Sequence, residues 1–267
     1  MDIIKQLQQE LQIGRQQVEA AVKLIDEGNT IPFIARYRKE ATGSLNDEVL
    51  RNLDERLRYL RNLEERKEQV ISSIREQEKL TPELEKQIQD APTLVAVEDL
   101  YRPYRPKRRT RAIIAKEKGL EPLANVISLQ MIKEPLEQIA KDYVSEEKGV
   151  ATVKDAIAGA KDILAETVSD NAEYRTYIRK ATMEQGMLSS SAKDETVSSV
   201  YEMYYNHEEP VKKVAGHRIL ALNRGEKEKI LTVKITAPRD QILRFLEKQL
   251  IPVSYTHLRA HETLMNL

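Results

Sequence analysis

The chain has 267 residues with 43 basic and 43 acidic side chains, so its formal net charge is zero and an anionic partner must be held by a local basic surface. It contains no cysteine, which excludes disulfides and thiolate zinc sites and agrees with a reducing compartment. No apolar run approaches the roughly 18 residues that a membrane span needs, and the N-terminus lacks a signal-peptide pattern, so we expect a cytoplasmic protein without membrane contact.

Helix-forming residues dominate the sequence, whereas glycine and proline number only 9 and 10. Amphipathic spacing predicts two short helices over 3–12 and 15–27. Apolar residues at intervals of mostly three and four then predict one long helix over roughly 46–79, with Ser44 and Asp47 marking its start. Further helices are predicted between Thr81 and Ala91 and over 111–118, 121–131, 135–143, 153–169, 172–185 and 196–206.

The region after residue 186 gives weaker patterns. Residues 187–193 are small and polar, which is typical of a linker or an edge strand, and 230–235 alternate as a half-buried strand does. Residues 217–225 fit a helix closed by Gly225 or a partner strand, and the helix is slightly favoured. We therefore expect a mainly α fold: an elongated multi-helix bundle with one long helix and a small β element near 217–235. The expected domains are 1–190, which is helical, and 191–251, which begins a central region.

The most unusual stretch is the basic segment, residues 101–111, which reads YRPYRPKRRTR and contains no acid. Its two internal prolines favour an extended backbone, its arginines suit phosphate oxygens, and its tyrosines can stack on unpaired bases. The candidate nucleic-acid contacts here are Tyr101, Arg102, Tyr104, Arg105, Lys107, Arg108, Arg109 and Arg111. The alternative is a structural connector whose arginines pair with Glu98, Asp99, Glu117 and the acids of the long helix.

A second, smaller basic cluster follows a short apolar stretch. Its candidate contacts to nucleic acid are Arg36, Arg38 and Lys39. In the alternative interpretation, Phe33 and Ile34 belong to the core. The basic residues then pair with Glu40, Asp47 or Glu48, and that alternative is favoured.

No recognised catalytic pattern is present. His207 and His217 have no known catalytic spacing, and the sequence has no phosphate-binding glycine loop, zinc spacing or calcium loop. His217, beside Arg218, could contact a phosphate, but a histidine that is hydrogen-bonded in the core or begins a helix is the favoured interpretation. We expect a protein that is not an enzyme and that binds no cofactor or metal.

The last residues do not resemble the rest of the chain. Residues 253–263 match a transposase sequencing adapter translated in frame, and Pro252 shares two bases with it. We therefore expect the native sequence to run through Ile251, with 252–267 a non-native tail and the rest of the gene product missing. This interpretation removes His257 and His261 from any metal-site argument.

Four stretches, in order and at suitable separations, resemble the bacterial Tex family of transcription accessory proteins. They are IPFIARYRKEATG at 31–43, LYRPYRPKRRTR at 100–111, GLEPL at 119–123 and HRILALNRGE at 217–226. The resemblance extends from near the start of the chain to about Ile251.

The resemblance implies a helical N-terminal and central region. In full-length members it is followed by an RNase-H-like domain, helix-hairpin-helix modules and a C-terminal OB-fold RNA-binding domain. The resemblance places the family's main nucleic-acid-binding site in that last domain. We therefore expect RNA or DNA to bind mainly through the full-length protein and only weakly to this fragment. We expect a non-enzymatic scaffold near the transcription machinery. The alternative is a platform for polymerase or ribosome-associated partners with no direct nucleic-acid contact in this fragment.

Overall fold

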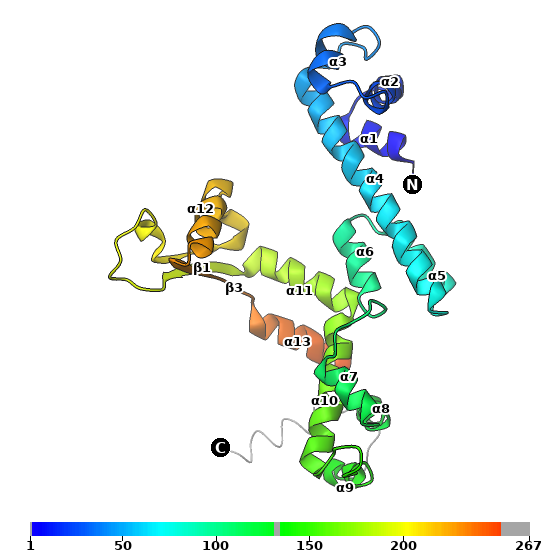
Figure 1. Cartoon of the computed structure of the whole chain (residues 1–267), viewed down its shortest axis with the longest axis vertical. Helices are drawn as coiled ribbons and strands as arrows, with labels where there is room; N and C mark the ends of the chain where they lie inside the picture. The colour runs from blue at the N-terminus through cyan, green and yellow to red at the C-terminus, as the bar shows by residue number, and fades with distance from the viewer. Residues whose placement is uncertain (1, 131–133, 252–267) are drawn as a thin grey trace. The chain divides into compact units, whose positions relative to one another are not determined.

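The structure is a computed structural model that describes residues 2–130 and 134–251, and it is mainly helical (Figure 1). This confirms the predicted fold class, with one 30-residue helix and a small sheet. The expected non-native tail lies outside the described residues. Contacts divide the chain into two units, of which the first ends at Arg108 and the second begins at Arg109, inside the basic segment. The predicted domain boundary after residue 190 stays a prediction.

The first unit consists of six helices among the described residues. They are α1 (Ile3–Leu11), α2 (Arg15–Asp26), α3 (Ile31–Tyr37), α4 (Asp47–Glu76), α5 (Pro82–Asp90) and α6 (Leu94–Tyr101). The predicted start of the long helix at Ser44 is wrong, because Ser44 has a left-handed backbone with φ of 64°. Asn46 caps α4 instead: its backbone is extended and its side chain accepts a hydrogen bond from the Val49 amide at 2.8 Å.

The apolar side chains along one face of α4 contribute to two clusters of buried residues. Its first half packs against α1, α2 and α3, with Leu7, Val18 and Ile34 among the buried residues. Its second half packs against α5 and α6, where Ile88 and Val97 are buried. The helix is therefore held on both halves by the elements that precede and follow it.

Among the described residues, the second unit begins with five helices and ends with a mixed region of strands and helices. Its helices are α7 (Arg111–Glu117), α8 (Glu121–Leu129), α9 (Leu136–Lys141), α10 (Val153–Asp170), α11 (Ala172–Gln185), α12 (Gly216–Lys227) and α13 (Arg239–Leu250), with short 3-10 turns η1 (Glu202–Tyr204) and η2 (Val211–Lys213). The helices α7 to α10 share a core in which Leu120 and Leu123 are buried. The predicted helices over 111–118, 121–131, 135–143, 153–169 and 172–185 are confirmed to within a few residues, apart from position 131, which is not described.

A three-stranded antiparallel sheet follows α11. Its strands are β1 (Met187–Ala192), β2 (Asn206–Pro210) and β3 (Leu231–Thr236), in the order β2-β1-β3. Ser189 lies opposite Glu208 on one side and Lys234 on the other. The strand predicted as one alternative over 187–193 is confirmed as β1, but its edge position is wrong, because β1 is the central strand. Only β3 lies in the predicted β element near 217–235.

The predicted helix over 196–206 is also wrong. The Asp194 carboxylate accepts hydrogen bonds from the Thr196 amide at 2.9 Å and from its hydroxyl at 2.6 Å. Such side-chain bonds compete with helix formation, and only the short η1 turn forms before β2. Tyr201 and Tyr204 are buried here against the sheet, which explains the apolar spacing that favoured a helix.

The helix slightly favoured over 217–225 is confirmed as α12, but Gly225 does not close it. Gly225 is buried inside α12, where a Cβ atom would lie 2.6 Å from Leu231 Cδ1 on β3. The glycine thus allows the helix to approach the sheet closely. The last helix, α13, was not predicted; it packs on α11 through Phe245 and Tyr177. Among the described residues, no helix combines the length and apolar character needed to cross a membrane.

Candidate nucleic-acid interface

The basic segment begins with a turn and not with the extended backbone that its prolines favour. The Arg105 amide donates to the Tyr101 carbonyl at 3.0 Å, so the chain continues for one turn beyond α6. The Gln77 side chain, just after α4, donates to the Tyr104 carbonyl at 3.0 Å. These bonds fix the start of the basic segment at the C-terminal end of α4.

Tyr101 is part of the core of the first unit. Only 8% of the residue is exposed, its hydroxyl is 3.0 Å from Ser73 Oγ, and the Arg66 guanidinium lies 5.5 Å from its ring centroid. Because so little of the residue is exposed, its ring is not accessible to a base. Tyr104 is half-buried against the same core and keeps part of its ring surface exposed.

The cations of the basic segment in the first unit lie mostly at the surface. Arg102, Arg105 and Arg108 are exposed and Lys107 is half-buried. Within the described ranges, the side chains of Arg105 and Arg108 have no hydrogen bond or ion pair. Glu98, which the connector hypothesis paired with the segment, instead accepts a hydrogen bond from Arg66 at 2.6 Å.

The remaining part of the basic segment belongs to the second unit. Arg109 pairs with Glu117 at 2.9 Å, as the connector hypothesis expects, and both side chains are more than half exposed. Such a surface pair contributes about 0–1 kcal/mol, so an anion can compete for Arg109. Thr110 caps α7 by accepting a hydrogen bond from the Ile113 amide at 3.2 Å, and Arg111 lies exposed in the first turn of that helix.

The α3 cluster, comprising Arg36, Arg38 and Lys39, combines cations with exposed aromatic rings. All three cations are exposed, and within the described residues none of them pairs with an acid. Phe33 is 37% and Tyr37 is 65% exposed, and their ring centroids are 5.3 Å apart. The prediction that Phe33 belongs to the core is therefore wrong, whereas Ile34 is fully buried as expected.

The loop after α3 is anchored, which fixes the position of the α3 cluster. The buried Thr42 hydroxyl donates to the Arg38 carbonyl at 3.1 Å. The Gln17 amide on α2 donates to the Gly43 carbonyl at 2.9 Å. Asp47, one of the acids expected to neutralise the cluster, pairs instead with Arg51 at 2.6 Å.

Comparison with known proteins identifies the family. Residues 1–75 match the model of the Tex-like protein N-terminal domain, and residues 132–260 match the model described as Tex central region-like. The chain belongs to the Tex family. In this Tex chain the α3 cluster lies inside the N-terminal match, and the basic segment lies between the two matches.

Named relatives show the same likeness over most of the chain. An uncharacterized protein, YdcI, of Bacillus subtilis is 48% identical over 96% of this chain and 36% of its own length. Protein tex of Bordetella pertussis is 45% identical over 89% of this chain and 30% of its own length. Transcriptional accessory protein Tex of Neisseria gonorrhoeae is 43% identical over 88% of this chain and 31% of its own length. The chain thus spans about a third of the length of these relatives.

Arginines on α4 of the Tex chain differ from those of the α3 cluster because they are engaged in ion pairs. Arg56 donates to Glu10 at 2.8 Å and holds the pKa of that carboxyl below its ordinary value, despite partial desolvation. Arg61 acts in the same way on Asp26, whose pKa it lowers through a hydrogen bond of 2.7 Å. These pairs join α1 and α2 to α4, so positive charge on α4 is used for structure.

The two histidines of the described Tex chain have ordinary structural positions. His217 is the second residue of α12 and is exposed, which confirms the predicted helix-start position. His207 on β2 lies 3.1 Å from Glu209, which also accepts a hydrogen bond from Arg218. The hydrogen bond from His207 and the charge of Arg218 hold the pKa of Glu209 below its ordinary value. The described residues include no group of three acidic or histidine side chains arranged to hold a metal.

Proposed function

We propose that this chain is the non-enzymatic N-terminal and central scaffold of a nucleic-acid-binding transcription accessory protein. In this proposal, the first unit contacts the phosphate backbone of single-stranded nucleic acid through two basic surfaces. One is the α3 cluster, and the other is the pair of exposed cations Arg105 and Arg108 in the basic segment, whose side chains form no ion pair among the described residues. The name of the Neisseria gonorrhoeae relative, transcriptional accessory protein Tex, supports the cellular role.

The observation that carries the proposal is the pairing of unneutralised cations with exposed aromatic rings on α3. Arg38 lies 5.3 Å from the Phe33 ring centroid, and Tyr37 extends the aromatic surface outward. Proteins that bind single strands combine cations along the backbone with aromatic faces on which bases stack. In this proposal, bases therefore stack on Phe33 and Tyr37, whose rings are accessible to a ligand, and not on Tyr101.

The two basic surfaces lie near opposite ends of α4 (Figure 1). The α3 cluster is linked to the chain that enters α4, and the basic segment is hydrogen-bonded to Gln77 at its other end. A helix of 30 residues is about 45 Å long. A single strand that contacts both surfaces must therefore span a comparable distance along α4.

Binding of fluorescent single-stranded RNA, measured by anisotropy over a series of salt concentrations, tests the proposal. The test variants are Arg36→Ala/Arg38→Ala/Lys39→Ala and Arg105→Ala/Arg108→Ala. The control variant, Arg15→Ala/Arg58→Ala, removes the same kind of charge from residues paired with Glu19 and Asp54.

Each lost phosphate contact should reduce the salt slope by about 0.7, so the two test variants should lose about 2 and about 1.4. In the unmodified chain, affinity should rise once the RNA is long enough to span the two surfaces, because both are then engaged at the same time. Equal slopes in test and control variants would contradict direct nucleic-acid contact. That result, combined with retained protein partners in a pull-down of the full-length protein, would favour a protein-interaction platform.

A further inference from the structure

A cavity of about 690 Å³ opens in the second unit between α11 and α13, and we call it the α11–α13 pocket. Its lining residues are Tyr177, Pro238, Arg239, Asp240, Gln241, Arg244, Phe245 and Lys248. It shares no residue with the basic segment or the α3 cluster. The wall contains two aromatic rings, one amide and three cations against a single acid.

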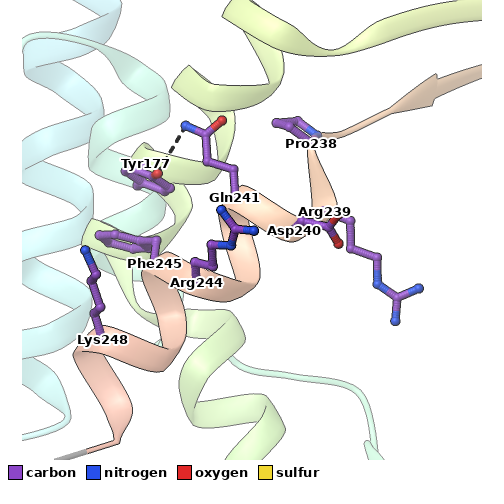
Figure 2. A pocket seen from close by; sticks show the side chains of 8 residues that line it. All are labelled: Tyr177, Pro238, Arg239, Asp240, Gln241, Arg244, Phe245 and Lys248. Carbon is purple, nitrogen blue, oxygen red and sulfur yellow. Dashed lines mark hydrogen bonds between the residues drawn. The ribbon is translucent and has the colours of Figure 1, made fainter. Parts of the chain in front are cut away.

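The aromatic wall is held in a fixed arrangement. Tyr177 and Phe245 stack with ring centroids 3.7 Å apart and an interplanar angle of 12°. The Gln241 amide donates to the Tyr177 hydroxyl at 3.3 Å, as the dashed line in Figure 2 shows. Tyr174 packs edge-on against Phe245 with a centroid distance of 5.9 Å. A flat ring that enters the pocket therefore meets a stack already in place.

The cations of the pocket are available to an anion. Arg239, Arg244 and Lys248 are exposed, and no described residue forms an ion pair with their side chains. Arg244 and Lys248 are four residues apart on α13, so they lie on one face of the helix about 6 Å apart along its axis. In Figure 2 Arg239 extends away from the other lining side chains. Arg244 and Lys248 are therefore the cations nearest to the aromatic wall.

We propose that the α11–α13 pocket binds a nucleotide, with its base against the Tyr177 and Phe245 stack and its phosphate held by Arg244 and Lys248. Aromatic faces accept any base, and arginine offers paired donors to phosphate oxygens. An acidic peptide would use the cations but leave the ring stack without a partner. A free nucleotide and one nucleotide of a single strand present the same chemistry.

The whole chain is tested with two probes, an end-labelled uridine RNA of about ten nucleotides and uridine monophosphate. The pocket variant is Arg244→Glu/Lys248→Glu. The matched control is Lys212→Glu/Lys227→Glu, which changes the same charge at exposed positions outside the pocket. Light-induced crosslinking of 4-thiouridine RNA, followed by mass spectrometry, locates the bound base directly.

The pocket variant should bind the RNA at least tenfold more weakly than the control, with a salt slope smaller by about 1.4. Crosslinks should map to α11 or α13, next to Tyr177 or Phe245. Competition by uridine monophosphate would identify a free nucleotide as a ligand, whereas crosslinks resistant to it would identify a strand.

Equal binding by pocket and control variants, with crosslinks outside α11 and α13, overturns the pocket. The α3-cluster variant separates this result from the proposed function. If the α3-cluster variant loses RNA affinity and the pocket variant does not, the proposed surfaces of the first unit are supported and the pocket proposal is overturned. If only the pocket variant loses RNA affinity, the pocket proposal is supported and the proposed role of the α3 cluster is contradicted.

Discussion

The substitution Gly225→Ala is expected to destabilise the second unit, although it replaces a poor helix former with the best one. A Cβ at this position would lie 2.6 Å from Cδ1 and 2.9 Å from Cγ of Leu231. Ordinary carbon contacts are about 3.5–4.0 Å. Leu231 is fully buried, and Tyr201 Cδ1 would also lie only 3.3 Å from the added Cβ, so the methyl group enters a site that is already closely packed.

Two opposing effects set the size of the change. Helix propensity favours alanine over glycine by about 1 kcal/mol in a helix interior. Overpacking of a close-packed core costs about 1–3 kcal/mol, and the buried position of Leu231 places this site in the upper part of that range. We therefore expect a net loss of about 1–2 kcal/mol in the free energy of unfolding.

Hydrogen exchange of the β3 amides, measured under native conditions, reports the stability of this region separately from the first unit. Gly216→Ala is the control, because nothing lies within 4 Å of a Cβ there. The double variant Gly225→Ala/Leu231→Ala removes the clash and should show a coupling energy of about 0.5–3 kcal/mol. Protection in Gly225→Ala equal to or above that of the unmodified chain would refute the packing argument.

Three further changes have defined outcomes. Tyr101→Phe removes the hydroxyl contact with Ser73 and should cost about 1 kcal/mol in urea unfolding, with RNA affinity unchanged; weaker RNA binding at equal stability would contradict its core position. Glu209→Gln should destabilise the chain near neutral pH, and the difference should vanish as pH falls below 4.5 through the lowered pKa of Glu209, as acid titration of unfolding would show. Asn46→Ala removes the cap of α4 and should lower the melting temperature by the equivalent of about 1 kcal/mol, whereas Ser44→Ala should have little effect on the cap.

The helices were predictable because their apolar spacing and end residues agree. The Thr81 and Thr110 caps accept hydrogen bonds from the Leu84 and Ile113 amides, as their sequence positions suggest. The sheet was not predictable in the same way. β2 has the sequence NHEEP, which offers no β-favouring alternation, and it forms by pairing with β1. Strand order depends on contacts between distant segments, which local patterns do not report.

The candidate site was only partly predictable. The absence of acids in the basic segment correctly marked exposed cations after α6, whereas the favoured pairing of the α3 cluster with nearby acids is not found among the described residues. Sequence could not separate Tyr101, which faces the core, from the more accessible Tyr104, because burial depends on Ser73 and Arg66 in α4. The exposed pair formed by Phe33 and Tyr37 has the spacing of helical neighbours, and this was the available signal for it.

The participation of α4 in two buried clusters limits where the first unit can be cut. The N-terminal family match ends at residue 75, but Val70, Ile71 and Ile74 are covered by α5 and α6. A shortened chain that stops at residue 75 would expose these three apolar side chains to water, and an exposed apolar patch of this kind promotes self-association. Expression of the N-terminal part alone should therefore extend through α6 and the Tyr104 turn.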